Sequence, residues 1–362
     1  MNTQEKPGRD ISFDLLRIIA AFSVVVLHVS GLYISANEVG SMDFKLANLI
    51  NSVSRFGVTI FVMISGSIFL SESKVIKTSK LWIHNILRMM IIFGVWSYAY
   101  YVYQSLYHWK FDFWNHGLVL TVTGCVYASD HFWFIFMIIG LYALVPFLRT
   151  WIHHAGKKEL DYFVVLFLVF QVGRTTIGNL LDKSLVQKIL DMVKIVELSW
   201  YLGYFVLGYI IIRYGVSKRL KVLIYSMVLV GIVANYIVSD YLLVRQGVYS
   251  PGIYDSFGIF TCIQTIAIFV FIRDIYSGKN ASQKSGTWKT SIQNVIVNLS
   301  KDTLGIYLMH VGLLDFFRSE GIIIGNMPAL PGIVLLSLLS FGICGVTAAI
   351  LRRIPVIGRY MC

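Results

Sequence analysis

Charged residues are scarce in this chain of 362 residues. Asp, Glu, Lys and Arg make up 14% of it, against about 25% in an average soluble domain. Apolar residues make up 57%, and they recur in runs of about 20 residues, the length that an α-helix needs to cross a bilayer. This composition excludes an ordinary soluble protein. It predicts an all-α, polytopic integral membrane helical bundle, because within lipid a helix satisfies its own backbone hydrogen bonds.

Cysteine is also scarce. The four cysteines lie far apart, without a CxxC pair or a His/Cys ligand set, so we expect reduced packing residues and no metal site. The net charge of +12 does not indicate a nucleic-acid partner, because Lys and Arg gather at the ends of the apolar runs, as topogenic charges do. Such clusters attract membrane lipid headgroups.

Ten apolar runs, separated by charged or Gly-, Pro- and Asn-rich breaks, predict ten membrane-spanning helices. They cover residues 11–33, 52–71, 86–106, 131–150, 160–178, 199–214, 220–242, 255–273, 301–317 and 330–351. The span at 199–214 is short, and the span at 301–317 contains Lys301, Asp302 and His310. No loop is long enough for a soluble domain, so we predict a single transmembrane domain over residues 1–362. No small-residue cleavage site follows the first run, which we therefore expect to be a retained helix.

Positive residues are distributed unequally between alternate loops. If the N-terminus is inside, cytoplasmic segments hold 21 of the 31 Lys and Arg residues, the opposite side holds nine, and Arg17 lies within the first span. Because Lys and Arg are enriched in cytoplasmic loops, we predict that both termini are cytoplasmic. The expected location is the cell (plasma) membrane.

The first span contains three ionisable residues, Asp14, Arg17 and His28. Such residues cost about 2.5–3.5 kcal/mol on insertion scales, and they indicate function by default. Arg17 and His28 are eleven residues apart, so they point within about 20° of each other, about 16 Å apart along the axis. Asp14 can hold the Arg17 guanidinium by an i,i+3 contact. Alternatively, Arg17 extends to the headgroups and His28 is an interfacial histidine.

The run Phe13-Asp14-Leu15-Leu16-Arg17, followed after ten residues by His28, resembles the first-helix signature of membrane acyltransferase family three. Four further stretches, in the matching order, resemble later helices of that family. They are residues 55–66, His131-Phe132-Trp133 with Tyr142 and Pro146, residues 203–209 and residues 304–310. The similarity covers nearly the whole chain.

One position departs from the family pattern. Members often carry Arg-x-x-Arg at the inner end of the third helix. Here Arg88 fits the second position, Asn85 occupies the first, and Lys77 and Lys80 lie upstream as substitutes. We expect Arg17, Arg88, Lys77 and Lys80 to bind the donor.

The resemblance implies an O-acyltransferase, in particular an O-acetyltransferase. The donor would be cytoplasmic acetyl-CoA, or another acyl-CoA, and the acceptor a hydroxyl group of a cell-surface glycan or lipid-linked precursor. Arg17 can hold a phosphate at two points, and His28 can remove the hydroxyl proton as general base. Ala21 and Val24, between them on one helix face, are expected to leave room for the pantetheine arm.

Supporting roles are open among several residues. Glu197, Asp130 or His310 could orient the base, and Tyr307, Trp133 or Ser65 could stabilise an oxyanion; Arg55 is a further supporting candidate. Each could instead be a packing residue, a belt aromatic or a solvated group. No nucleophile elbow indicates a covalent intermediate. Many relatives carry an extracytoplasmic esterase-like domain. We expect none here, and therefore predict direct delivery or hand-over to a separate protein.

Two other functions fit the same class of chain. A transporter or flippase would suit ten helices with intramembrane charges, although no internal repeat links two halves and the charges gather in the first span. A small-molecule-binding module of the same fold is the other alternative. Thioester hydrolysis by the purified protein would distinguish the enzyme from both.

Overall fold

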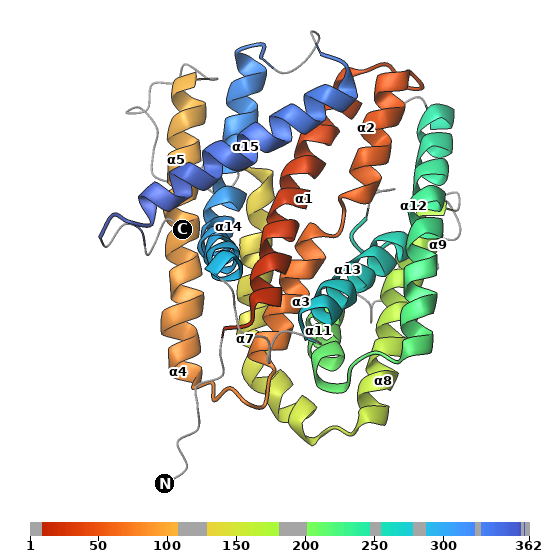
Figure 1. Ribbon diagram of the computed structural model, residues 1–362, viewed down its shortest axis with the longest axis vertical. Coiled ribbons are helices and arrows are strands. Elements are labelled where there is room, and N and C mark those ends of the chain that lie inside the picture. Colours follow the sequence, from red (N-terminus) through yellow and green to blue (C-terminus); the bar gives the residue numbers. More distant parts are fainter. Residues whose placement is uncertain are drawn as a thin grey trace.

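The computed structural model describes residues 9–107, 129–180, 201–246, 255–277, 287–322, 327–355 and 358. Within these ranges every regular element is helical (Figure 1), which confirms the predicted class. The elements are α1 (Ile11–Ala36), α2 (Met42–Val53), α3 (Gly57–Phe69), α4 (Thr78–Lys80), the π-helical segment Leu81–Ile86, α5 (Leu87–Tyr107), the 3₁₀ turn Asp130–Phe132, α7 (Trp133–His154), α8 (Lys157–Leu166), the π-helical segment Phe167–Gly173, α9 (Arg174–Leu180), α11 (Leu202–Tyr214), α12 (Lys218–Gln246), α13 (Ile259–Ser277), α14 (Thr287–Ser319) and α15 (Ala329–Leu351).

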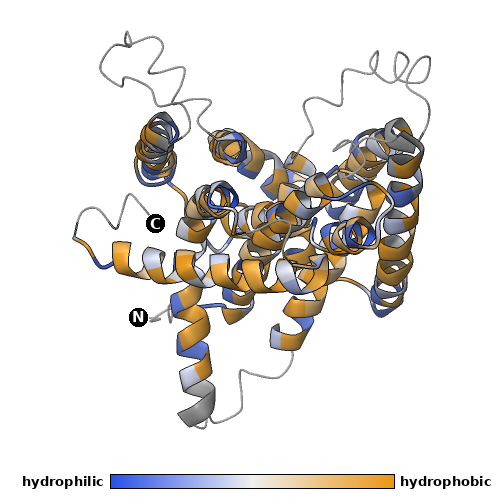
Figure 2. Cartoon of the chain, turned by 90° about the horizontal axis from the view of Figure 1, so that it is seen from above, coloured by the Kyte–Doolittle hydropathy of each residue, from blue (hydrophilic) through white to orange (hydrophobic). Residues whose placement is uncertain are grey.

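Eight helical stretches in the described ranges are long and apolar enough to cross a membrane, and each overlaps a predicted span. They are Ile11–Ala36, Met42–Phe69, Thr78–Leu106, Asp130–His154, Lys157–Ile177, Lys218–Val238, Ile259–Tyr276 and Ala329–Leu351. Hydrophobic residues predominate along these helices (Figure 2), and many large apolar side chains remain exposed on their outer faces. That surface suits lipid, since a soluble monomer rarely exposes large apolar patches.

The two remaining predicted spans also correspond to helices. The span at 199–214 corresponds to α11, which has only 13 residues and is about 20 Å long at 1.5 Å per residue. The span at 301–317 lies in α14, which has 33 residues and is polar in its first half. Both are held by protein contacts, α11 against α3 and α14 against α1 and α15. Ten spans is therefore an approximate number, because these two helices depend on the bundle.

α1 runs through the centre of the bundle (Figure 1) and contacts α2, α3, α13, α14 and α15. Its N-terminus is capped by Asp10, whose carboxylate accepts a hydrogen bond from the Ser12 backbone N–H at 3.0 Å, as helix starts require. Because other helices surround α1, its ionisable residues face protein and internal space rather than lipid.

The second span is broken between α2 and α3. At the end of α2, Asn51 donates to the Leu27 carbonyl of α1 at 3.0 Å and accepts from Arg55 Nε at 2.9 Å. At the start of α3, a Cβ on Gly57 would lie 2.7 Å from the Ala20 carbonyl oxygen. The break therefore places the Arg55 backbone beside α1, with side-chain partners that make irregular backbone tolerable at this depth.

α3 and α11 cross with their backbones in contact. A Cβ added to Gly66 would lie 1.7 Å from the Phe205 carbonyl oxygen, and one added to Gly208 would lie 2.1 Å from that of Met63. No Cβ fits at either place, so small residues set this approach, as in other membrane helix pairs. The close contact fixes α3, which forms one wall of the cavity described below.

We expect Gly66→Ala to destabilise the protein by at least about 1–3 kcal/mol, since overpacking forces backbone shifts. A lower thermal unfolding midpoint in detergent would report this loss. Gly140→Ala on α7 is the matched control, because a Cβ there meets nothing within 4 Å. Equal midpoints for the two variants would show that α3 and α11 do not pack this closely.

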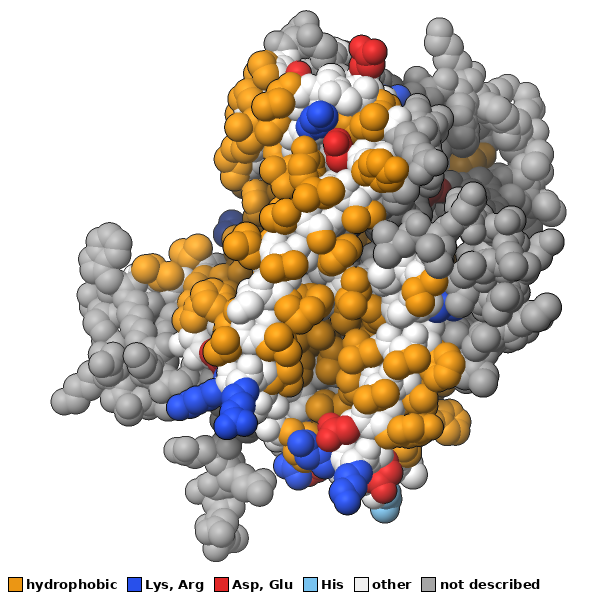
Figure 3. Space-filling model, turned by 90° about the vertical axis from the view of Figure 1, so that its right-hand side faces the viewer, with side chains coloured by type: hydrophobic (Ala, Val, Ile, Leu, Met, Phe, Trp, Pro, Cys, Tyr) orange, Lys and Arg blue, Asp and Glu red, His pale blue; other side chains and the backbone are white. Residues whose placement is uncertain are grey.

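Lys and Arg side chains gather at one end of the bundle, the lower end in Figure 3, where α1 and α8 begin. We predict that this end, with both chain termini, is cytoplasmic. Reporter fusions at Met1 and Cys362 should both give a cytoplasmic signal. Signals on opposite sides would mean an odd number of spans, and α11 would be the first helix to lose its assignment.

Candidate active site

A cavity of about 320 Å³ opens between α1, α3, α5, α7 and α14. It lies in the half of the bundle that holds the start of α1. Its lining contains four basic side chains and no acidic one. These residues line it: Arg17, Phe61, Ile64, Ser65, Ile68, Phe69, His84, Asn85, Arg88, Met89, Phe134, Ile138, Tyr142, Ser300, Lys301, Thr303, Leu304 and Tyr307. A site with this charge selects anions.

Three permanent cations surround the outer part of the cavity. Arg17 comes from α1, Arg88 from α5 and Lys301 from α14. Lys74 adds a fourth nearby: burial, with the positive charges of Arg149 and Arg17, lowers the pKa of its amine. Converging cations repel one another, so an anion bound here would relieve that repulsion as well as form its own contacts.

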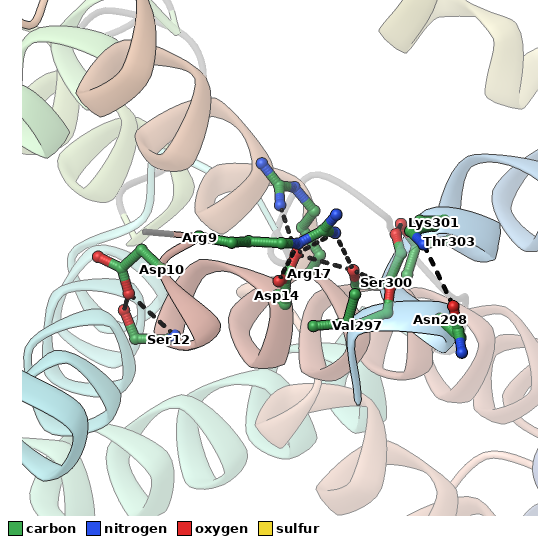
Figure 4. Close-up of polar contacts among 10 residues, drawn as sticks. All are labelled: Arg9, Asp10, Ser12, Asp14, Arg17, Val297, Asn298, Ser300, Lys301 and Thr303. Atoms are coloured by element: carbon green, nitrogen blue, oxygen red, sulfur yellow. Dashed lines mark hydrogen bonds and ion pairs between the residues drawn. The ribbon is translucent and has the colours of Figure 1, made fainter. Parts of the chain in front are cut away.

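A buried carboxylate holds the guanidinium of Arg17 (Figure 4). Asp14 is 1% exposed, and its Oδ1 lies 3.0 Å from Arg17 Nη1, which confirms the predicted i,i+3 contact. Arg9 Nε donates to Asp14 Oδ2 at 2.6 Å, and the Ser300 hydroxyl donates to Oδ1 at 2.8 Å. This network fixes the end of the Arg17 side chain at the cavity while 30% of that side chain stays exposed.

The π-helical segment Leu81–Ile86 leads into α5 at the cavity wall. Its wider turn brings His84 and Asn85 to the same lining as Arg88. Insertions of this kind in helices are frequent at functional sites. Lys77 and Lys80, the predicted substitutes for the missing arginine, are exposed and lie outside the lining.

The inner end of the cavity is Tyr307, which lies beside a group of three histidines. The ring centroid of Tyr307 is 5.5 Å from that of His131 and 5.8 Å from that of His310. His310 is in turn 5.0 Å from His28 and 5.6 Å from His131. The predicted base, His28, thus contacts His310 of α14, which also contacts His131 in the 3₁₀ turn before α7, at the place where the cavity ends.

The hydrogen bonds of His310 fix its tautomer. Its Nδ1 lies 2.7 Å from the Tyr307 carbonyl oxygen, an acceptor only, so Nδ1 carries the proton and Nε2 a lone pair. That Nε2 is buried and has no hydrogen-bond partner among the described residues. A buried, unpaired nitrogen is costly, and a hydroxyl group entering the cluster would satisfy it.

The cluster does not resemble a metal centre. Among the described residues, no three His, Cys, Asp or Glu side chains are arranged to hold a metal ion. Ring contacts between neutral imidazoles are instead suited to proton transfer, since each has one donor and one acceptor nitrogen.

The predicted route along α1 is wrong. Ala21 and Val24 are 1% and 4% exposed, and neither lines the cavity. The β-carbon that Gly57 lacks would lie 2.7 Å from Val24 Cγ2, so α3 closes that face of α1. Open space passes instead between α3, α7 and α14, which the helix-wheel argument could not include because it used one helix.

The other predicted supporting residues divide into two groups. Ser65 and Tyr307 line the cavity, although the Tyr307 hydroxyl donates to the His131 carbonyl and is thus engaged. Trp133 is 44% exposed and stacks on Tyr201, with centroids 5.5 Å apart, outside the lining. Asp130 is exposed. Glu197 lies outside the described residues.

Four cavity or cluster residues did not stand out in the sequence. His131 and Tyr142 were part of a family-like motif without a role, and Lys301 was counted as a topogenic charge. His84 completes the group. The position of His131 directly before an apolar run was the available signal, but only packing brings it to His310.

A family model described as "Acyltransferase domain" matches residues 10–349 of the chain. No curated protein and no solved structure matches the chain.

Proposed function

Because this chain belongs to that family of membrane acyltransferases, we propose that it takes an acyl group from cytoplasmic acyl-CoA, most simply acetyl-CoA. The acceptor is a hydroxyl group on an extracytoplasmic glycan or lipid-linked glycan precursor. The product is an O-acyl ester on the cell surface, and coenzyme A returns to the cytoplasm.

The observation that carries this proposal is the acid-free, cationic cavity that ends beside the histidine cluster. Coenzyme A has its phosphates at one end and its thioester at the other, joined by an extended arm. Arg17, Arg88 and Lys301 suit the phosphates, since charge-assisted bonds to phosphate are strong. The apolar part of the lining, which includes Phe134 and Leu304, suits the arm.

The histidines provide the acid–base chemistry. His28 removes the proton from the acceptor hydroxyl as its oxygen attacks the thioester carbonyl. Collapse of the tetrahedral intermediate breaks the carbon–sulfur bond, and the proton then passes from the imidazolium to the leaving thiolate. His310 accepts, at its unpaired Nε2, a hydrogen bond from a second, non-reacting hydroxyl group of the acceptor, and this contact orients the reacting hydroxyl toward His28. No covalent acyl-enzyme is required.

The transporter and the small-molecule-binding module remain the competing functions. A transporter would need a passage through the bundle, and a binding module would need only a ligand site. Neither function requires three neighbouring imidazoles. The cationic cavity alone would also suit a protein that only binds or transports an anion. An assay of acyl transfer is therefore needed to distinguish the enzyme from these alternatives.

The test is turnover by the purified protein in detergent or nanodiscs. With acetyl-CoA and a polyhydroxylated acceptor such as a membrane glycan extract, we expect free thiol to appear and labelled acetyl to enter the glycan fraction. Release without an acceptor should be slow, since water would be a poor substitute for a positioned hydroxyl. Acetyl-CoA that binds but stays intact under all conditions would favour a binding module or transporter.

A further inference from the structure

A second cavity, of about 730 Å³, lies among α8, α9, α11, α12 and α13. Its volume is within the 300–1,000 Å³ typical of small-ligand pockets. No residue lines both cavities. α11, which packs on α3 backbone to backbone, contributes to this second cavity and not to the first. The second cavity is therefore separate from the candidate active site.

The walls of this cavity are aliphatic over most of their length. They include Leu168 and Val172 beside α8, Leu207 on α11, Leu223 on α12 and Ile266 on α13. The lining extends along α8 and α9 from Val164 to Ile177, roughly 20 Å at the rise of a helix. This exceeds the depth of one leaflet, about half of the 30 Å hydrocarbon thickness, so a whole alkyl chain fits lengthwise.

One end of the cavity is polar. Lys157, Asp161, Tyr214 and Ser217 line it, where α8 and α12 begin and α11 ends. Lys157 Nζ is 3.7 Å from Asp161 Oδ2, and both side chains are more than half exposed, so this ion pair is weak. The amine also lies 6.0 Å from the centroid of the Tyr214 ring. It is available to a stronger anion.

The surroundings of this end are positive. α12 begins here with Lys218 and Arg219, and its first turn holds no acidic residue. The Ser217 hydroxyl accepts a hydrogen bond from the Leu220 N–H at 3.3 Å, and the N-terminal end of the helix dipole adds partial positive charge. Lys158 is exposed on α8. Figure 3 shows the face formed by α8 and α12, with hydrophobic side chains above and charged groups, most of them Lys and Arg, at the lower end.

We propose that this cavity binds one anionic phospholipid from the leaflet at the basic end of the bundle. One acyl chain lies between α8, α11, α12 and α13, and the phosphate lies between Lys157 and the start of α12. The charge favours an anionic headgroup over a neutral one, because each nearby Lys or Arg attracts it. The lipid fills the space behind α11 and thereby supports the α3–α11 contact that shapes the active-site wall.

Lipid titrations followed by native mass spectrometry test this proposal. The full-length protein in neutral detergent is titrated with dioleoyl phosphatidylglycerol and, separately, with dioleoyl phosphatidylcholine. We expect one phosphatidylglycerol retained per chain, with roughly fivefold higher affinity than phosphatidylcholine. Turnover is not measured, so the outcome is independent of the proposed reaction.

Paired variants separate this site from general lipid adhesion. Lys157→Glu should weaken phosphatidylglycerol binding roughly tenfold, while Lys45→Glu, on α2 and outside the lining, should leave it nearly unchanged. Met227→Trp, which fills the cavity, should lower the affinity for both lipids. Leu229→Trp, on the same helix and 69% exposed, is its control, and Leu223→Trp replaces Met227→Trp if that variant does not fold.

Three results would overturn the proposal. They are equal binding of the two lipids to the wild type, an equal effect of the two lysine variants, and unchanged binding in both cavity-filling variants. Each would mean that the cavity holds only unspecific detergent or surrounding lipid.

Discussion

We expect His28→Ala to abolish acyl transfer for practical purposes, lowering kcat by about 10²–10⁴-fold with little change in donor affinity. The reason is the position of His28 in the histidine cluster, 5.0 Å between ring centroids from His310, at the end of the cavity. A general base contributes a factor of this size, and it acts only in the chemical step, so kcat rather than donor binding should fall. Single-turnover measurements of thiol release with saturating acetyl-CoA would give the value.

The control for this variant is His154→Ala. His154 lies at the exposed C-terminal end of α7, where its Nδ1 is hydrogen-bonded to the Thr150 carbonyl. The 3₁₀ turn that holds His131 precedes the other end of α7, so the loss of His154 should leave turnover intact. Both variants should elute as monodisperse protein. If His28→Ala keeps more than about a tenth of wild-type turnover, His28 is not the base, and His310 becomes the residue to test.

Arg17→Ala is expected to raise the apparent KM for acetyl-CoA about 10–100-fold. Charge-assisted hydrogen bonds contribute about 1.5–3 kcal/mol, and about 1.4 kcal/mol corresponds to tenfold in affinity. Arg17→Lys should also weaken binding, despite keeping the charge, because an amine lacks the planar fork that holds phosphate at two points. The kcat of both variants should change less than that of His28→Ala. Donor titrations would measure this difference.

Short thioesters separate donor binding from a structural role. An acyl thioester of pantetheine lacks the nucleotide phosphates, so Arg17→Ala should affect its KM much less than that of acetyl-CoA. Arg318→Ala, an exposed arginine at the other end of the bundle, serves as the matched control. Equal acetyl-CoA affinity in the wild type and in Arg17→Ala would mean that Arg17 serves only as the partner of Asp14, and the threaded-donor scheme would fail.

Much of the fold was predictable because its causes are local. An apolar run long enough to cross a bilayer must become a helix, whatever surrounds it. Eight predicted spans therefore coincide with helices that meet the length and apolarity requirements. The Asp14–Arg17 ion pair was predictable for the same reason, since side chains three residues apart are neighbours on any helix.

The short α11 and the polar α14 show where local reasoning ends. α11 is too short to span the hydrocarbon as a straight helix, and α14 begins well before the predicted span 301–317, with a first half that is polar. Contacts with α3 and α1 hold them. The predicted route of the pantetheine arm along Ala21 and Val24 was wrong for a similar reason, because the space on a helix face depends on which neighbouring helix covers it.

The sequence alone therefore determined the membrane class, the eight long apolar spans and the Asp14–Arg17 contact, and it predicted Arg17 and His28 of α1 as the two ends of the candidate site. Tertiary structure decided which residues complete the site. His131 comes from the 3₁₀ turn before α7 and His310 from α14, both more than 100 positions along the chain from His28. Lys301 joins Arg17 and Arg88 at one cavity. Hydropathy and helical periodicity act within a segment, whereas a cavity is the space left between segments. Its shape depends on how close the helices approach, as at Gly66 and Gly208.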